Sequence, residues 1–272
     1  MSGFALRALH GDFGAELSGL DLSRDLTGEA ATALVAALDR HGLLFLPQPM
    51  ALAPERQVAL VRLLGEPSDN GSGRLWSVLD NAGDAGAMTL PFHCDLSYTD
   101  APIALISLYA QALPEGGTTT SFVSNVAAWA GLPADLQARL APLHLRHRHV
   151  SRLPGDWPVF TAVHPLAAPH PRSGAPMLFV TEHHAERILE LDEAQSAAML
   201  SRLFAHLYAA PRIYTHRWRP HDLLLWDNRA VQHARRAPAD PAAGARRMRR
   251  VVIGDTSFTE LVARARQRER AA

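Results

Sequence analysis

The sequence predicts a mixed α+β protein whose core is a β-sandwich or jelly roll, with helices packed outside it. Strand-like runs are separated by helices of ordinary length, a pattern that also fits a parallel α/β sheet. Two observations favour the sandwich: no Gly-rich phosphate loop follows an early strand, and the spacing of strands and turns after residue 88 is irregular. With 272 residues, 47% of them hydrophobic, the chain can bury a full core, and we predict a single domain over residues 1–272.

Apolar residues at helical spacing predict four helices, at residues 27–41, 54–64, 133–140 and 192–208. The first has clear boundaries, because Thr27 is a suitable N-cap and Gly42 a C-terminal stop. Short apolar runs predict strands at 43–46, 89–94, 103–110, 119–123, 144–150, 161–164, 177–181, 223–226 and 248–253. Residues 71–86 are rich in Gly, Asp and Asn, so we predict a long loop there and a candidate mobile lid over about residues 67–90.

The composition of the chain indicates which kinds of binding partner and which cellular compartment to expect. Lys+Arg and Asp+Glu are equal, at 27 each, so the net charge of zero gives no support to a nucleic acid or a membrane surface as partner. No apolar run has the length of a signal peptide at the N-terminus or of a transmembrane span later. The single cysteine, Cys94, excludes an internal disulfide framework. These features predict a protein of the reducing cytoplasm.

Two short segments far apart in the sequence carry candidate metal ligands. His93-Cys94-Asp95 ends a predicted strand, in which residues i and i+2 point to the same face, so His93 and Asp95 can reach one metal ion. Cys94 then points away, and we interpret it as a small buried residue rather than a nucleophile. The other segment ends in His233. Two histidines and one carboxylate are the ligand set of a non-haem Fe(II) oxygenase, which leaves three coordination positions open.

The orientation of His233 stays open at this level. It follows the buried run 223–226 and the polar residues 227–229. These polar residues are typical of an Asx turn that merely ends a strand, or of a turn that presents His233 inward. Further histidines, at 144, 147, 149, 183 and 184, could suggest a second metal. We interpret them as ordinary histidines, because alternate histidines on a surface strand are common.

Four arginines begin the last predicted strand. By alternation, Arg246 and Arg250 share one face with Met248, whereas Arg247 and Arg249 share the other. In isolation the stretch resembles a solvated basic patch. The apolar residues 251–253 continue the strand on both faces, so we predict that one arginine set points into a cavity. A buried arginine needs an anionic partner, and a carboxylate held bidentately is the natural one.

The chain resembles the taurine dioxygenase / 2,4-dichlorophenoxyacetate dioxygenase (TauD/TfdA) family over roughly residues 14–255. The segments that carry the resemblance are 14–22, 41–46, 93–98, 114–120, 216–220, 226–233 and 246–255. Family membership implies a distorted jelly-roll core (a double-stranded β-helix, cupin-like) with flanking and inserted helices. It also implies Fe(II), 2-oxoglutarate as co-substrate, O2, a small-molecule substrate, and a homodimer or homotetramer.

The resemblance implies a role for each matched residue. His93, Asp95 and His233 would ligate iron. Thr120 would help to hold a 2-oxoglutarate carboxylate, Arg246 would pair with the distal carboxylate, and Arg250 would lie near the substrate or the co-substrate. The segment between His233 and the arginines is about two residues longer than is usual, so Arg247 and Arg249 are alternatives, and an extra threonine makes Thr119 the alternative to Thr120. The pocket-lining regions of relatives correspond here to Asn70, Trp76, Phe92, Ser97 and Tyr98.

The implied reaction is oxidation of a small organic substrate, most often hydroxylation, with release of succinate and CO2. An anionic substrate is one candidate. Because Asp95 is present, where related halogenases have a small residue, the resemblance favours oxygenation over halogenation. Two alternatives are the same oxidising chemistry directed to desaturation, cyclisation or rearrangement of a natural-product or amino-acid intermediate, and a non-catalytic jelly-roll binding protein.

Overall fold

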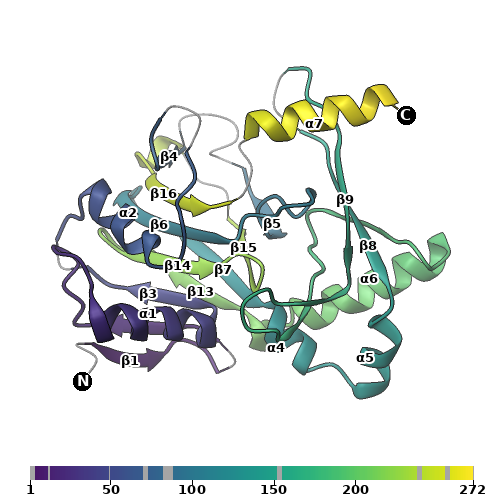
Figure 1. Cartoon of the computed structure of the whole chain (residues 1–272), viewed down its shortest axis with the longest axis horizontal. Helices are drawn as coiled ribbons and strands as arrows, with labels where there is room; N and C mark the ends of the chain where they lie inside the picture. Colours follow the sequence, from purple (N-terminus) through teal and green to yellow (C-terminus); the bar gives the residue numbers. More distant parts are fainter. Residues whose placement is uncertain are drawn as a thin grey trace.

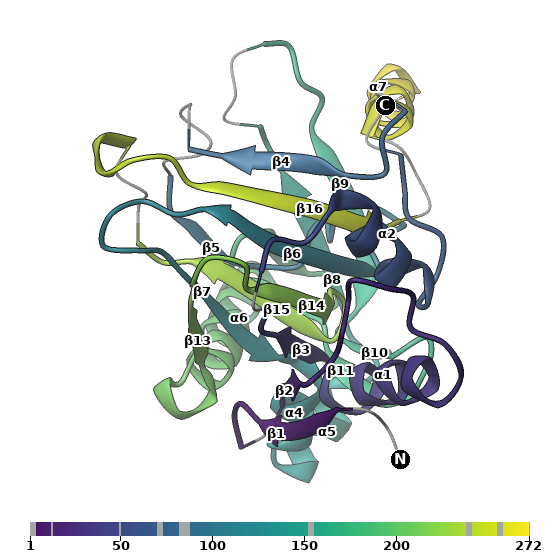
Figure 2. The same ribbon diagram turned by 90° about the vertical axis from the view of Figure 1, so that its left-hand side faces the viewer.

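The computed structural model describes residues 4–11, 13–48, 50–69, 73–81, 88–151, 155–237, 241–254 and 258–271. Two sheets form its centre, and helices lie around them (Figures 1 and 2). The seven-stranded sheet has the order β1 (Ala5–Ala8), β2 (Ala15–Ser18), β3 (Leu43–Leu46), β14 (Leu223–Asp227), β6 (Leu105–Ala112), β16 (Arg247–Ile253) and β4 (Ser77–Asp80). The four-stranded sheet has the order β13 (Tyr214–Arg217), β7 (Thr119–Ser124), β15 (Val231–Arg235) and β5 (Leu90–His93).

Smaller elements extend this centre on one side. A three-stranded sheet has the order β12 (Ala185–Ile188), β8 (His144–His149) and β9 (Phe160–Pro165), and β10 (Ala167–Pro169) pairs with β11 (Pro176–Leu178). Helices α4 (Asn125–Ala130), α5 (Ala134–Leu140) and α6 (Glu193–Leu207) gather beside β8 (Figure 1). The remaining helices are α1 (Gly28–His41), α2 (Pro54–Arg62) and α7 (Phe258–Ala271), with short 3₁₀ turns at Ala210–Arg212 and Pro241–Ala243.

A shared hydrophobic cluster joins the two main sheets face to face. Phe122 and Val231 enter it from the four-stranded sheet, and Ile106, Leu224 and Met248 enter it from the seven-stranded sheet. Each of these side chains is at most 1% exposed. Alternate residues of a strand face opposite sides, so one face of each sheet supplies this core. The predicted mixed fold with a sandwiched β core and outer helices is therefore present.

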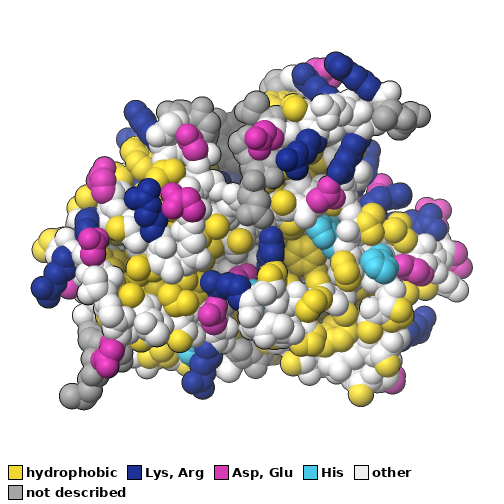
Figure 3. All heavy atoms as spheres, viewed as in Figure 1, with side chains coloured by type: hydrophobic (Ala, Val, Ile, Leu, Met, Phe, Trp, Pro, Cys, Tyr) yellow, Lys and Arg dark blue, Asp and Glu magenta, His cyan; other side chains and the backbone are white. Residues whose placement is uncertain are grey.

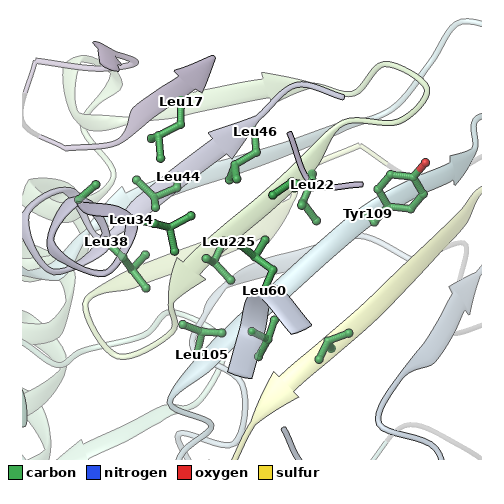
Figure 4. Close-up of a cluster of buried hydrophobic side chains, with 14 of the residues drawn as sticks. Leu17, Leu22, Leu34, Leu38, Leu44, Leu46, Leu60, Leu105, Tyr109 and Leu225 are labelled. Atoms are coloured by element: carbon green, nitrogen blue, oxygen red, sulfur yellow. The ribbon is translucent and has the colours of Figure 1, made fainter. Parts of the chain in front are cut away.

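The opposite face of the seven-stranded sheet is covered by α1 and α2. Leu34 and Leu38 of α1 pack against Leu44 of β3 and Leu225 of β14 (Figure 4). The predicted helix stop is also present, since Gly42 has φ 69° and its N–H donates to Leu38 O at 2.8 Å. That left-handed conformation costs glycine little and other residues more, which fits the chain reversal into β3.

Arg249 lies on this outer face and ties α2 to β16. Its side chain is 2% exposed, and it donates to Gln57 Oε1 and to the Leu52 carbonyl, both at 2.7 Å. Its guanidinium also lies over the ring of Tyr109, with the carbon 4.6 Å from the ring centroid. Arg249 is therefore a structural arginine, on the face away from the shared core.

Substitution Arg249→Met should lower the free energy of unfolding by about 2–4 kcal/mol, because it leaves two buried acceptors without a donor. Urea denaturation followed by circular dichroism measures the loss. The matched control is Arg247→Met on the exposed side of the same strand, for which we expect almost no change. Equal stability of the two variants would contradict the structural role of Arg249.

Several elements differ from the sequence-based expectation, β4 and α7 among them. The predicted loop 71–86 contains β4, which pairs with β16 through Val78↔Arg249. Residues 70–72 and 82–87 lie outside the described part, so the lid stays a prediction. The C-terminal helix α7 was not predicted, and its Leu261 and Ala265 pack against Phe160. Among the described residues, no helix is long and apolar enough to cross a membrane.

Candidate metal and co-substrate site

Sheet pairing brings the two candidate histidine ligands together. His233 of β15 lies directly opposite His93 of β5 in the antiparallel register, and their ring centroids are 4.2 Å apart. Asp95 follows β5 immediately, and its Oδ1 lies 3.3 Å from Nε2 of His93 and 3.6 Å from Nε2 of His233. The ligand atoms of all three residues lie within 4.8 Å of one another. The three sequence-predicted ligands therefore converge on one point.

The segment before His233 has a different role from the one expected. Asp227 does form an Asx turn, since its Oδ1 accepts from the N–H groups of Arg229 and Ala230 at 3.0 Å. This turn connects β14 of the seven-stranded sheet to β15 of the four-stranded sheet, so His233 lies on a strand rather than on the turn itself. Both alternatives are therefore present. The Asx turn lies at residues 227–230, and the inward histidine lies further along, on β15.

Asn228 holds the backbone at Asp95, and sequence reasoning gave it no role. Its side chain accepts from the N–H of Asp95 at 3.0 Å and donates to the Asp95 carbonyl at 3.1 Å and to the Ile103 carbonyl at 2.8 Å. The side chain is fully buried. Such clamps fix a ligand's direction before a metal binds. Only the position of Asn228 after a strand and a turn could have hinted at this contact.

The protonation of the three groups favours a cation between them. The carbonyl of Pro91 accepts from Nδ1 of His93 at 2.7 Å, so the lone pair of Nε2 faces Asp95. Burial, followed by the nearby His93, lowers the pKa of His233 to about 3, which keeps that imidazole neutral. Burial alone would raise the pKa of Asp95, but the charge of Arg250 is the largest effect that opposes it, and the pKa lies below its usual range. Three electron-pair donors that face one another fit a bound divalent iron.

Arg250 reaches across from the other sheet to the same carboxylate. Its Nη2 pairs with Oδ2 of Asp95, whereas Oδ1 faces the two histidines. The carboxylate therefore has one oxygen turned to the arginine and one to the metal position. Because β16 belongs to the seven-stranded sheet and Asp95 follows β5, this ion pair links the two sheets at the site.

Arg246 is a buried cation whose side chain has no carboxylate partner among the described residues. Its side chain is 5% exposed and its Nε lacks a hydrogen-bond partner, while its backbone N–H donates to Oδ1 of Asn81 at 2.9 Å. Burial, followed by the charge of Arg235, lowers the pKa of Arg246 to about 10. Arg235 belongs to β15, so Arg246 faces the four-stranded sheet. A buried guanidinium without an anionic partner is costly, so this position suits a ligand that carries a carboxylate.

The four arginines now have distinct positions. Arg246 and Arg250 face the four-stranded sheet, Arg249 lies on the outer face, and Arg247 is exposed. The alternation in the sequence thus predicted the inward pair, although β16 has an irregular register between Arg247 and Met248. Neither Arg247 nor Arg249 is placed to meet a ligand between the sheets.

Thr120 lies on the inner face of β7, which also carries Phe122 and adjoins His233. Its side chain is 6% exposed, and its Oγ1 accepts from the indole N–H of Trp218 at 2.9 Å. The hydroxyl hydrogen therefore remains able to donate to a carboxylate. Thr119 points to the opposite face, because neighbouring residues alternate along a strand. Of the two threonines, Thr120 is the one directed inward.

The predicted pocket-lining residues divide into two groups. Tyr98 stacks on His149 with ring centroids 4.4 Å apart, and Ser97 Oγ lies 3.0 Å from Nδ1 of His184, whose ring centroid lies 6.1 Å from that of His93. Phe92 instead stacks on Tyr208 and is 4% exposed, so it belongs to the core. Trp76 packs on the outer cluster, and Asn70 lies outside the described residues. Cys94 is fully buried, and burial raises the pKa of its thiol, as a structural cysteine requires.

Comparisons with known proteins agree with this arrangement. The family described as "Taurine catabolism dioxygenase TauD, TfdA family" matches residues 5–252. The chain is 29% identical to an (S)-phenoxypropionate/alpha-ketoglutarate-dioxygenase of Sphingobium herbicidovorans, over 85% of this chain and 88% of that protein. It is 28% identical to an alpha-ketoglutarate-dependent sulfate ester dioxygenase of Pseudomonas putida, over 82% of this chain and 81% of that protein.

A solved structure shows the same fold. It is a taurine dioxygenase from Burkholderia xenovorans, similar to this chain with a TM-score of 0.80 and 26% identity, over 93% of this chain and 92% of that one. Sequence match, fold and converging ligands lead to the same assignment. The chain belongs to the TauD/TfdA family of Fe(II)- and 2-oxoglutarate-dependent dioxygenases.

Proposed function

We propose that this dioxygenase hydroxylates a small organic anion and releases succinate and CO2. The observation that carries the proposal is the pairing of two features between the same two sheets. One is the group of His93, Asp95 and His233, and the other is the buried Arg246, whose side chain has no carboxylate partner among the described residues. A group of three metal-binding side chains alone is compatible with many classes of protein. A buried arginine that has no carboxylate partner among the described residues also suits a binding site for 2-oxoglutarate.

The metal end of the site depends on three residues and their supports. His93, Asp95 and His233 would hold Fe(II), Pro91 fixes the tautomer of His93, and Asn228 fixes the backbone of Asp95. When bound, iron with 2-oxoglutarate and O2 supplies the oxidising chemistry that the side chains lack. The protein's own contribution is a fixed ligand geometry beside the apolar cluster of Phe122 and Trp226, whose indole ring lies 5.0 Å from the ring of His233.

The co-substrate end depends on Arg246 and Thr120. The guanidinium of Arg246 would take the distal carboxylate of 2-oxoglutarate through two parallel hydrogen bonds, an arrangement that fits its planar donors. Thr120 would donate its hydroxyl to the same anion while Trp218 holds its oxygen. Both residues lie between the sheets, where low polarity strengthens each hydrogen bond.

The charges between the sheets favour an anionic substrate. Arg246 and Arg250 are positive, and of these two only Arg250 pairs with the carboxylate of Asp95 among the described residues. Divalent iron and dianionic 2-oxoglutarate cancel each other, so positive charge remains for the substrate. Two relatives are named for anionic substrates, a phenoxypropionate and a sulfate ester. Arg250, beside the metal position, is the residue we propose to steer the substrate anion.

The two face-to-face sheets support a distorted jelly roll as the finer description of the core. The single cysteine is consistent with work in the cytoplasm. A homodimer or homotetramer, and the roles of residues 67–90 as a lid, stay predictions. Family membership and the complete ligand set count against a non-catalytic binding protein.

A screen of small carboxylates, sulfonates and sulfate esters tests the proposal. Purified protein with Fe(II), ascorbate, O2 and 2-oxoglutarate should release succinate, and mass spectrometry of the co-product should show the gain of one oxygen atom. Loss of two hydrogen atoms would instead identify desaturation, and an unchanged composition a rearrangement. Under anaerobic conditions, Fe(II) plus 2-oxoglutarate should give a weak visible charge-transfer band. Iron-loaded protein that neither gives this band nor turns over 2-oxoglutarate would exclude the proposed function.

A further inference from the structure

A second group of three histidines lies beside the iron ligands. It consists of His149 at the end of β8 and of His183 and His184 in the turn before β12. Their ligand nitrogens all lie within 4.8 Å of one another. The sequence-based interpretation as ordinary surface histidines is wrong for His184, which is 4% exposed. Within the described part of the chain, only this trio and the iron trio bring three metal-binding side chains so close.

The backbone holds the trio without help from a ligand. The N–H of His183 donates to the Phe92 carbonyl at 3.2 Å, so the turn is joined to the residue just before the iron ligand His93. The carbonyl of His184 accepts from the N–H of Arg148 at 2.8 Å, which joins the same turn to β8 beside His149. Two strands from different sheets therefore fix where the three imidazoles stand.

The ring positions match a shared metal ion. Centroids are 4.4 Å apart for His183 and His184, 5.4 Å for His149 and His184, and 6.3 Å for His149 and His183. Three imidazoles bound tetrahedrally at roughly 2.0–2.1 Å have centroids roughly 5 Å apart, so small rotations of the rings are sufficient. Ser97 Oγ lies 3.0 Å from Nδ1 of His184, which orients that ring and leaves Nε2 as the ligand atom.

We propose that His149, His183 and His184 form a second metal site, which takes Zn²⁺ or a similar d-block cation. The trio supplies only imidazole nitrogens, which suits these cations and not Mg²⁺ or Ca²⁺. Three protein ligands leave the fourth tetrahedral position open. The ring of His183 lies 5.7 Å from that of His93, so an ion here would sit next to the iron position. His149 and His183 are partly exposed, which gives an ion access from solvent. On the face seen in Figure 3, histidine side chains are visible at the surface near β8 and β9.

Metal stoichiometry tests this site independently of turnover. The full chain, without a polyhistidine tag, is stripped with chelator and dialysed against buffered Zn²⁺ or, anaerobically, Co²⁺. We expect two ions per wild-type chain. His233→Ala, which damages the iron site, should keep one, and its bound Co²⁺ should show the intense visible bands of a tetrahedral ion.

Three further variants locate the second ion. His149→Gln and His183→Gln should each bind one ion per chain, with at least a tenfold weaker second binding event. The matched control is His144→Gln, which removes a histidine from the same strand β8 and should still bind two. Near-ultraviolet circular dichroism identifies any variant that has lost its fold. If a variant of the trio does not fold, the metal stoichiometries of wild type and of His233→Ala still test the second site.

The outcomes separate this site from the proposed function. One ion per wild-type chain, with none in His233→Ala, would overturn the second site and leave the dioxygenase proposal intact. Two ions retained by both His149→Gln and His183→Gln would place the extra ion elsewhere and also overturn it. Failure of 2-oxoglutarate turnover with two bound ions would contradict the function alone.

Discussion

His93→Ala is expected to abolish 2-oxoglutarate-dependent succinate release, with a loss of more than about a hundredfold in rate. Removing even a hydrogen-bond partner of a metal ligand typically costs about 10–100-fold, and His93 is itself a ligand. The remaining Asp95 keeps its ion pair with Arg250, so two donors alone would have to retain the iron. Succinate is measured by chromatography at saturating 2-oxoglutarate and Fe(II).

The control for His93→Ala is His144→Gln, whose side chain pairs with Glu190 on the far end of β8. It should keep wild-type activity. Circular dichroism checks that His93→Ala remains folded, since the side chain is buried at the end of β5. Retention of more than about a tenth of wild-type turnover by a folded His93→Ala protein would mean that His93 is not an iron ligand.

Arg246→Ala is expected to raise the KM for 2-oxoglutarate about 30- to 1,000-fold. A bidentate, charge-assisted pair in a buried site contributes about 2–4 kcal/mol, and each 1.4 kcal/mol is a factor of about ten. Arg246→Lys should fall between wild type and Arg246→Ala, because a lysine restores the charge but not the planar pair of donors. Initial rates of succinate release across a 2-oxoglutarate series give the KM for each protein.

Arg247→Ala is the matched control, since Arg247 is the exposed neighbour on the same strand. Its KM should equal that of wild type. An unchanged KM in Arg246→Ala together with a raised one in Arg250→Ala would show that the co-substrate is held by Arg250 instead. That result would move the distal carboxylate toward Asp95 and weaken the assignment of Arg250 to the substrate.

Local patterns in the sequence were sufficient for part of the site. Strand alternation predicted that Arg246 and Arg250 share a face, and it held because the register shift between Arg247 and Met248 places its extra residue, Gln111, in β6 and leaves β16 continuous. The choice between the inward and outward sets needed the partner sheet, which no local pattern shows. Only the packing of α2 reveals that Arg249 is structural.

Long-range contacts account for what the sequence did not predict. Asn228 holds Asp95 from a position 133 residues later, so no spacing rule connects them. β4 was read as part of a loop because it is a short strand at the sheet edge, flanked by glycines. The trio was interpreted as ordinary histidines because alternate histidines on a surface strand are common. His149 and His183-His184 are far apart in sequence, and only the pairing of β8 with β12 brings them together.

The direct opposition of His93 and His233 in the β5–β15 pair has a thermodynamic consequence. In a disordered loop, binding a metal would have to order the side chains and backbone that supply the ligands, at about 1–2 kcal/mol per residue for the backbone alone. Here sheet hydrogen bonds have already restricted those residues when the chain folds. Little of the free energy of iron binding is therefore spent on ordering the ligand residues, which favours a higher affinity. We also expect that the ion can leave and return while the protein stays folded.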